Sequence, residues 1–416
     1  MKGLPEVSQA HLDKETEHII EKIRERGEAW IVGGWIRNLI LKISPGDVDI
    51  ATNLLPEEIL EIFPKSIMVG EKFGTVRVRI DNESKEIEVT TLRSDGKYID
   101  GRKPESVVFG VKIEEDIARR DFTINAMALD KDDILIDKYD GIADLENNIL
   151  RCVGNADERI REDGLRILRA FRFIGLKDEQ MMSFDSDLEN AIINNVSMID
   201  NISKERINQE LKKILALNNR IFILQRMIDL GVLQLIFDNL EIDLRVILSN
   251  EYAVNIALIC NSYKGNGESL SKYIREKLKI SSKEKELIRF LHDNGKRIPD
   301  NTNISEMRRF RASVSENNAN SLFKYLRGIG ISTNDVESAI DSLPPLRVGR
   351  NPLVNGEILI GKTGLEPEMR LGRLKGWLHR KQIEMDLDNI EQVLELLDDI
   401  DWENSNPAEW PYLSWP

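Results

Sequence analysis

The chain has 416 residues, more than one domain normally holds, and its 41% apolar content is typical of a globular protein and excludes a disordered one. Its net charge of −14 argues against nucleic-acid binding through a generally basic surface, although local clusters of Lys and Arg remain candidate sites. No apolar run approaches the roughly 18 residues of a membrane helix, and the N-terminus has no signal-peptide core. The two distant cysteines, Cys152 and Cys260, suit a reducing cytosol. We therefore expect a cytoplasmic protein with no membrane partner.

The most informative stretch lies near the N-terminus. Its predicted elements are, in order, a strand at 29–32, a turn at Gly33–Gly34, a short helix at 35–42 that carries Arg37, and a strand at 47–51. Residues i and i+2 of a strand share a face, so Asp47 and Asp49 should lie side by side. Adjacent carboxylates suit Mg²⁺, and the glycine turn leads into a helix N-terminus, which attracts phosphate. An Asp-x-Asp pair alone is usually surface charge, but this combination predicts metal-assisted transfer at a nucleoside triphosphate.

Two segments of alternating polarity follow, at residues 74–80 and 86–93, and predict paired strands. Glu88 lies on the strand expected beside Asp47 and Asp49, where it would complete a carboxylate cluster; the alternative is an exposed strand glutamate. Residues 94–105 contain two Asp-Gly pairs and a proline, and predict a long polar loop beside the candidate site.

A second charged segment begins at residue 113. Arg119 and Arg120 suit phosphate, because guanidinium groups form paired charge-assisted hydrogen bonds, and Asp121 would accept hydrogen bonds from a sugar hydroxyl. The alternative is an exposed run of helical salt bridges. That alternative explains residues 114–116 well and the sequence of residues 119–126 less well.

A third charged segment covers residues 161–173. Asp163 and Arg166 are spaced i, i+3 and are predicted to share one helix face, where an acceptor and a donor would meet the edge of a nucleobase. Arg169 and Arg172 extend the basic stripe. For the pair alone, an ordinary intrahelical salt bridge is the favoured alternative.

Beyond residue 150 the apolar periodicity is helical. The predicted helices are at 188–196, 207–217, 221–235 and 244–260, with breaks at 265–267, 298–300 and 343–345.

The isolated His292–Asp293 pair lacks the further ligands of a phosphohydrolase. Prolines in residues 398–416 forbid a simple helix, and the tryptophans there either dock on the body or bind a partner.

Together these motifs resemble the class II tRNA nucleotidyltransferases, the bacterial and eukaryotic type of CCA-adding enzyme, and their poly(A) polymerase relatives. The resemblance runs from about residue 29 to residue 214. It rests on Gly33-Gly34 with Asp47-x-Asp49, on residues 88–93, on the loop of residues 95–104, on residues 119–126, on residues 162–166 and on residues 203–212. A weaker likeness returns at residues 346–355.

The resemblance implies an α+β fold, with an N-terminal mixed β-sheet nucleotidyltransferase head followed by an all-α neck, body and tail. The implied domains are a catalytic head at 1–150, a helical neck and body at 151–275 with the nucleotide-templating helix, and a tRNA-binding body and tail at 276–416. It also implies addition or repair of CCA at the tRNA 3′ end from CTP and ATP, with release of pyrophosphate.

The implied roles follow the motifs. Asp47 and Asp49 would hold catalytic Mg²⁺, with Glu88 as a third ligand or base. The implied nucleotide-binding residues are Gly33, Gly34, Arg37, Arg119, Arg120, Asp121, Asn125, Asp163, Arg166, Arg169 and Arg172. The loop of residues 94–105 would help the switch from C to A addition. Two departures stand out: Asn38 replaces an aspartate usual in the family, and Arg350 replaces a common glycine.

Three alternatives remain at this stage. A poly(A) polymerase would share the head motifs, and a split-activity enzyme would add only CC or only A. A noncatalytic RNA-binding regulator belongs to a different class, and retention of both Asp47 and Asp49 argues against it.

Overall fold

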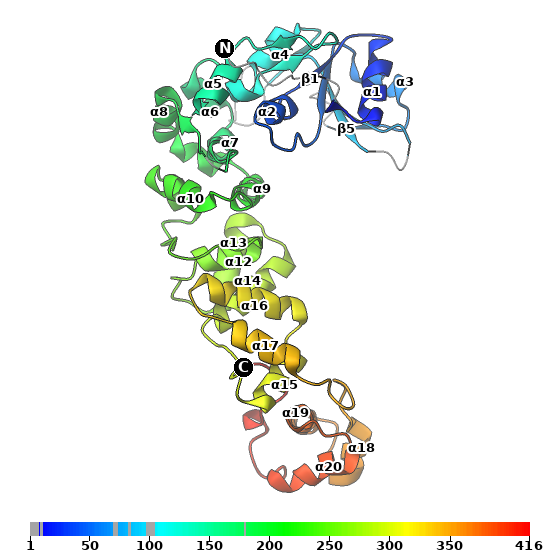
Figure 1. Ribbon diagram of the computed structural model, residues 1–416. Helices are drawn as coiled ribbons and strands as arrows, with labels where there is room; N and C mark the ends of the chain where they lie inside the picture. Colours follow the sequence, from blue (N-terminus) through cyan, green and yellow to red (C-terminus); the bar gives the residue numbers. More distant parts are fainter. Residues whose placement is uncertain (1–7, 9–10, 70–73, 82–84, 97–104, 179) are drawn as a thin grey trace. The chain divides into compact units, whose positions relative to one another are not determined.

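The computed structural model describes residues 8, 11–69, 74–81, 85–96, 105–178 and 180–416 (Figure 1). The chain forms two compact units, residues 1–239 and 240–416. The expected head and the first helices after it therefore pack into one unit. The expected division at residue 275 falls inside helix α13 (Gly267–Leu278), which packs against α14 (Ser282–Asn294).

The first unit is built on a seven-stranded mixed sheet, as expected. In spatial order its strands are β3 (Ile67–Met68), β4 (Thr75–Val78), β5 (Ile87–Thr91), β2 (Asp49–Thr52), β1 (Ala29–Val32), β8 (Ala128–Leu129) and β9 (Leu135–Ile136). Strands β2 and β5 run parallel, and the other neighbouring pairs run antiparallel. Two small sheets pair β6 (Arg93–Asp95) with β7 (Val107–Phe109) and β10 (Ile149–Leu150) with β11 (Ser183–Phe184).

Helices complete this unit. They are α1 (Lys14–Arg24), α2 (Gly34–Ile40), α3 (Pro56–Ile62), α4 (Ile113–Ala118), η3 (Thr123–Asn125), α5 (Gly141–Asn147), α6 (Ala156–Glu162), α7 (Leu165–Ile174), α8 (Ser186–Asn194), η4 (Val196–Asn201), α9 (Lys204–Leu215), α10 (Arg220–Asp229) and α11 (Val232–Ile236). Helices α1 and α3 lie beside each other (Figure 1). Asp13 caps α1 by accepting a hydrogen bond from the Thr16 N–H, which satisfies one of the free donors of the first turn.

A buried cluster connects the central strands to the segments that carry the site. It contains Val32, Ala51, Leu92, Ile113, Ile117, Ala126, Ala128 and Val153. The cluster fixes the ends of β1 and β2 against α4 and against the chain that precedes β8. Its packing therefore sets the positions of the polar residues that follow each element.

The predicted strand at 29–32 is confirmed as β1, but the next strand begins at Asp49 and not at Asp47. Strand β1 ends at Val32, which pairs with Asp49, and the chain then turns at Gly33. No β1 residue therefore remains to pair with the chain before Asp49. Asp47 lies in a bend just before the strand, so the two aspartates do not share a strand face as predicted.

The expected single helix at 161–173 is also wrong. Helix α6 ends at Glu162, Asp163 has extended backbone angles (φ −151°, ψ 106°), and α7 begins at Leu165. Gly164 between the two helices packs closely, since a Cβ there would lie 2.7 Å from the Met198 carbonyl oxygen. Asp163 therefore precedes the helix that carries Arg166, and the two side chains are brought together by the junction and not by one helix face.

Three further predictions differ in detail. The start of the expected loop at 94–105 is strand β6, and most of that loop, residues 97–104, lies outside the described residues. The expected helix at 221–235 is broken at Gly231, which has φ +76°, a conformation that favours glycine. The expected helix at 244–260 begins only at Tyr252, because the Asn255 side chain bonds the backbone N–H and C=O of Ser249 and holds the preceding segment in a turn.

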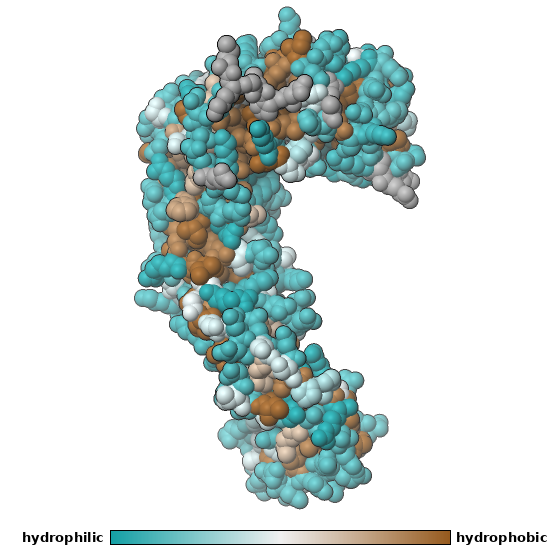
Figure 2. Space-filling view, in the orientation of Figure 1, coloured by the Kyte–Doolittle hydropathy of each residue, from teal (hydrophilic) through white to brown (hydrophobic). Residues whose placement is uncertain are grey.

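The second unit is helical throughout its described elements. Besides α13 and α14 these are α12 (Tyr252–Ile259), α15 (Ile304–Ser313), α16 (Glu316–Gly328), α17 (Asn334–Ser342), α18 (Gly356–Thr363), α19 (Met369–Met385), α20 (Ile390–Glu395), η5 (Leu396–Asp399) and η6 (Pro407–Glu409). The predicted breaks at 298–300 and 343–345 lie between helices, and the break at 265–267 reaches the first residue of α13. Hydrophilic residues cover most of the face of this unit seen in Figure 2. Within the described residues, no helix is long and apolar enough to cross a membrane.

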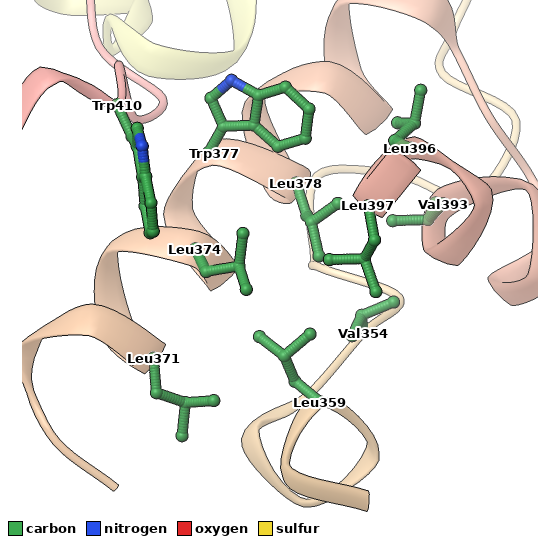
Figure 3. Packing of buried hydrophobic residues seen from close by; sticks show 10 residues of the cluster. All are labelled: Val354, Leu359, Leu371, Leu374, Trp377, Leu378, Val393, Leu396, Leu397 and Trp410. Carbon is green, nitrogen blue, oxygen red and sulfur yellow. The ribbon is translucent and has the colours of Figure 1, made fainter. Parts of the chain in front are cut away.

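The C-terminal tryptophans dock on the second unit. Trp410 is 5% exposed and packs with Leu371, Leu374 and Trp377 of α19 (Figure 3). Trp415 is 8% exposed, and its ring meets the ring of Phe310 edge-on at 4.9 Å. The tail is therefore part of the core of this unit, which decides between the two possibilities that the sequence left open.

Candidate active site

A polar cavity of about 420 Å³ opens in the first unit, at the ends of β1 and β2. It is lined by Gly33, Gly34, Arg37, Asp49, Arg119, Arg120, Asp121, Asn125, Asp163, Arg166, Arg169, Arg172 and Phe173. The cavity thus brings together residues from three separate segments of the sequence. Among the candidate residues, Asp47 and Glu88 lie outside this lining.

The glycine turn forms one wall of the cavity. Gly33 has φ +76° and precedes α2, and a Cβ on it would lie 2.8 Å from Nη1 of Arg120. The turn therefore lets the Arg120 guanidinium lie directly against the backbone, which no larger residue would allow without a shift.

The candidate metal ligands lie at the edge of the sheet beside this wall. Asp49 on β2 is in register with Glu88 on the parallel strand β5, as the sequence predicted for neighbouring strands. The pKa of Asp49 is raised, first by desolvation and then by the negative charges of Glu88 and Asp47, while Arg120 lowers it. The carboxylates of Asp49, Asp47 and Glu88 therefore repel one another, and a bound cation would reduce this repulsion.

Glu88 itself is exposed and lies 3.4 Å from Nη2 of Arg77 on β4. Within the part of the chain that the structure describes, no group of three or more His, Cys, Asp or Glu side chains is arranged to hold a metal ion.

Arg119 and Arg120 follow helix α4 and share the buried carboxylate of Asp116. The Nη2 atoms of Arg119 and Arg120 lie 2.7 and 3.4 Å from its two oxygens. Each guanidinium therefore makes a helical salt bridge, but to a buried carboxylate and not on an exposed face as the alternative had it, and both side chains also line the cavity. Asp116 fixes the direction of two cations that face the same space as Asp49.

Asp121 is the buried anchor of the basic side of the cavity. It accepts hydrogen bonds from the Arg169 Nε at 2.7 Å and from the Asn125 amide at 3.0 Å. Although burial raises its pKa, Arg169 and these hydrogen bonds bring the pKa well below its ordinary value. Asn125 also accepts a hydrogen bond from Arg37, whose pKa burial lowers to about 10, helped by repulsion from Arg172. Since Asp121 is held by protein groups, it organises the cavity wall as well as facing the cavity.

Asp163 and Arg166 are held by different partners. Arg206 of helix α9 donates to both oxygens of Asp163, at 3.2 and 2.6 Å. Arg166 is buried and donates to the carbonyl oxygen of Arg159 at 2.8 Å and to Glu162 at 2.5 Å. Both side chains line the cavity, so an acceptor and a donor face the same space from fixed positions.

Phe173 is a lining residue that the sequence analysis missed. The guanidinium carbons of Arg37, Arg169 and Arg172 lie 5.0, 5.2 and 4.5 Å from the centre of its ring. Such cation–π contacts allow like charges to pack side by side. The i, i+4 spacing of Arg169 and Phe173 was the available sequence signal, but an aromatic residue in an amphipathic helix more often belongs to the core.

Two stretches of the chain match known protein families. Residues 29–151 match the family described as the poly A polymerase head domain, and residues 181–244 match one described as a probable RNA and SrmB-binding site of polymerase A. The mixed sheet and the first match identify residues 29–151 as a head domain of the poly A polymerase type.

The CCA-adding enzyme of Ligilactobacillus salivarius is 33% identical over 385 residues, which cover 90% of this chain and 93% of that protein. The chain belongs to the family of the CCA-adding enzymes. The enzyme from Geobacillus kaustophilus is 46% identical over 199 residues, and that match spans about half of each protein, 48%. The Bacillus stearothermophilus CCA-adding enzyme, whose crystal structure is a complex with CTP, has a TM-score of 0.76 and 27% identity, with coverage of 93% of this chain and 97% of that chain.

Proposed function

We propose that the protein is a template-independent tRNA nucleotidyltransferase that adds or repairs CCA at the tRNA 3′ end from CTP and ATP and releases pyrophosphate. One observation carries the proposal: four sets of residues line the same cavity. They are the Gly-Gly turn, Asp49, the two arginines after α4 and the Asp163–Arg166 pair. Family membership supports the proposal, through a match that covers 90% of the chain.

The proposed cofactor is Mg²⁺, held by Asp49 and Asp47. The raised pKa of Asp49, due to desolvation and to two neighbouring carboxylates, fits a position that a divalent cation would stabilise. Mg²⁺ commonly takes one or two carboxylates and completes its shell with water and substrate phosphates, which agrees with the small number of acids grouped here. When bound, it would polarise the phosphate and activate the attacking hydroxyl. Glu88 stays a candidate for an assisting role at the same edge.

The protein side chains would bind and orient the nucleotide. Arg119 and Arg120, directed by Asp116, would donate to the triphosphate, and Asp121 would face the ribose. Arg37, Arg169 and Arg172 would add positive charge around Phe173. Because these donors are already oriented, little reorganisation remains for the reaction itself.

Base selection is proposed for Asp163 and Arg166. Arg206 holds the carboxylate of Asp163, while Glu162 and the Arg159 carbonyl hold Arg166. A fixed acceptor and a fixed donor can pair with the edge of C or A. A wrong base would leave a hydrogen-bonding group at this contact without a partner, which costs about 1–3 kcal/mol for a buried group.

The decisive experiment is the extension of truncated tRNA with CTP alone, with ATP alone and with both, read at nucleotide resolution. We expect CC from CTP alone and CCA from the mixture. Long A tails without CTP would identify a poly(A) polymerase, addition of only CC or only A would identify a split enzyme, and binding without extension would identify a regulator. The cytoplasmic location and the switching role of residues 94–105 belong to the same proposal.

A further inference from the structure

A second polar cavity, of about 600 Å³, lies within the second unit and has no part in the proposed reaction. The loops after α12 and α14 and the helix α16 form it. Its lining includes Tyr263, Lys264, His292, Lys296, Arg297 and Tyr325. These loops contain two stretches that the sequence predicted only as breaks between helices.

Three cations of this cavity have no ion-pair partner among the residues that the structure describes. Lys264, Lys296 and Arg297 are exposed, and among the described residues none of the three side chains has an ion pair or a hydrogen bond. The chain has 72 acidic and 58 basic residues, so acidic partners are not scarce. Three unpaired cations around one concavity repel each other unless an anion binds between them.

The carboxylate in the lining is already engaged. Asp293 accepts a hydrogen bond from the backbone N–H of Gly267 at 2.6 Å, at the first residue of helix α13. A carboxylate at this position also stabilises the positive end of the helix dipole. The negative charge of Asp293 is thus partly neutralised by the N-terminus of α13. The three cations outnumber this carboxylate, so the cavity has a net positive charge.

The walls of the cavity are fixed by contacts that leave the three cations free. The His292 Nε2 donates to the carbonyl oxygen of Gly265 at 2.9 Å, which ties α14 to the loop after α12. Tyr263 stacks on Tyr273 at 6.2 Å and meets His292 edge-on at 5.9 Å. Tyr325 donates to Asn261 at 2.9 Å, which holds α16 against the same loop. A site whose walls are already ordered loses little entropy when a ligand binds.

We propose that this cavity is a phosphate-binding site. Phosphate groups match it because they are small, anionic and rich in acceptors, as three convergent donors require. Two sources supply this chemistry: the backbone of a bound RNA and a free anion such as pyrophosphate or a nucleoside triphosphate. The RNA source rests on the proposed function, and the free-anion source does not.

The test compares two triple variants of the full-length protein. One carries Lys264→Gln, Lys296→Gln and Arg297→Gln. The matched control carries Arg275→Gln, Lys279→Gln and Lys362→Gln, which remove the same charge from exposed positions of the same unit. Thermal unfolding checks that both are folded. A third variant, Lys264→Arg with Lys296→Arg, keeps the charge and should keep the binding.

The first measurement is tRNA affinity as a function of salt. If RNA phosphates occupy the cavity, the first variant should bind tRNA roughly ten- to hundredfold more weakly at low salt. The slope of log K against log salt should also fall by about two to three, close to one for each lost contact. The control should change affinity less than about threefold.

The second measurement is calorimetric titration with inorganic pyrophosphate without metal. Loss of one binding event in the first variant, with unchanged tRNA affinity, would identify a free anion as the ligand. No change in either measurement would overturn the proposal. CCA addition at saturating tRNA is measured on the same variants and should stay within about twofold of wild type. Wild-type protein that fails to add nucleotides would refute the proposed function while leaving the pyrophosphate result valid.

Discussion

The side-chain amide of Asn38 links Arg37 to the segment before Asp47, because it both accepts and donates hydrogen bonds. Its Oδ1 accepts from the Arg37 Nε at 3.0 Å, and its Nδ2 donates to the carbonyl oxygens of Ser44 and Pro45, both at 3.1 Å. An aspartate could accept from Arg37 but could not donate to these carbonyls. The residue that departs from the family pattern therefore connects the buried arginine to the segment that leads into Asp47.

Loss of the candidate metal ligands is the first prediction at this scale. Asp49→Ala or Asp47→Ala should lower nucleotide addition at least about a thousandfold, because metal charge at the reacting phosphate supplies several kcal/mol of transition-state stabilisation. Filter binding should show tRNA affinity within about threefold of wild type. Asp132→Ala, at an exposed aspartate of the same unit, is the control and should keep full activity. Appreciable turnover by either mutant would remove these residues from the metal site.

Nucleotide choice is the second prediction for single residues. Asp163→Ala should raise incorporation of UTP and GTP relative to CTP and ATP by roughly ten- to hundredfold, since an unpaired buried group costs about 1–3 kcal/mol. Competition assays with all four nucleotides measure this ratio. Asp157→Ala is the control, because Asp157 pairs with Arg161 within α6 and accepts a hydrogen bond from Asn195 at the end of α8. If Asp163→Ala slows all four nucleotides equally, Asp163 serves only to bind Arg206.

At the scale of elements, the junction of α6 and α7 decides the geometry of base selection. Periodicity across residues 161–173 suggested one helix, yet the chain is extended at Asp163. Gly164 is pressed against the backbone of η4 at Met198, and the first turn of α7 begins directly after it. Packing of a neighbouring segment, which periodicity does not contain, therefore sets the angle between the two candidate base-reading side chains.

A methyl group added at Gly164 tests whether close packing of the α6–α7 junction sets the position of Asp163. Gly164→Ala should lower the free energy of unfolding of the first unit by about 1–3 kcal/mol, because its Cβ would lie 2.7 Å from a backbone oxygen. It should also reduce nucleotide discrimination, since Asp163 is the adjacent residue. Denaturant unfolding and the competition assay measure the two effects. Gly372→Ala in α19, where nothing lies within 4 Å of the added carbon, should be neutral or stabilising by up to about 1 kcal/mol. Equal stability of Gly164→Ala and wild type would contradict this account.

At the scale of the whole molecule, each compact unit contains one buried cysteine. Cys152 belongs to the first unit and Cys260 to the second, and burial raises the pKa of each thiol to about 12. A raised thiol pKa disfavours the reactive thiolate while the unit is folded. Its contribution to stability is complete below the unfolded pKa of about 8.5 and is lost as the pH rises toward 12. Labelling at pH 7.5 therefore reports the opening of each unit separately.

Cysteine labelling can test how much the docked C-terminal tail stabilises the second unit. Trp410→Ala should destabilise the second unit by about 3–5 kcal/mol, because it removes a 5% exposed ring from a closely packed cluster. The labelling rate of Cys260 should rise, while that of Cys152 should stay unchanged. Tyr412→Ala is the control, since Tyr412 is 51% exposed. A parallel rise at both cysteines would mean that the two units unfold as one.

The sequence alone determined the class of fold, the strand at 29–32, the pairing of residues 74–80 with 86–93, and most of the polar residues that line the cavity. These follow from local periodicity and from motifs, which depend on the order of residues. The roles assigned to these residues remain predictions. Only the tertiary structure decided where β2 begins, since that depends on where β1 ends at Val32. It alone brought Arg37 to Phe173, gave Asp163 its partner Arg206 and docked the tryptophans, because each of these contacts joins segments whose distance along the chain carries no local signal.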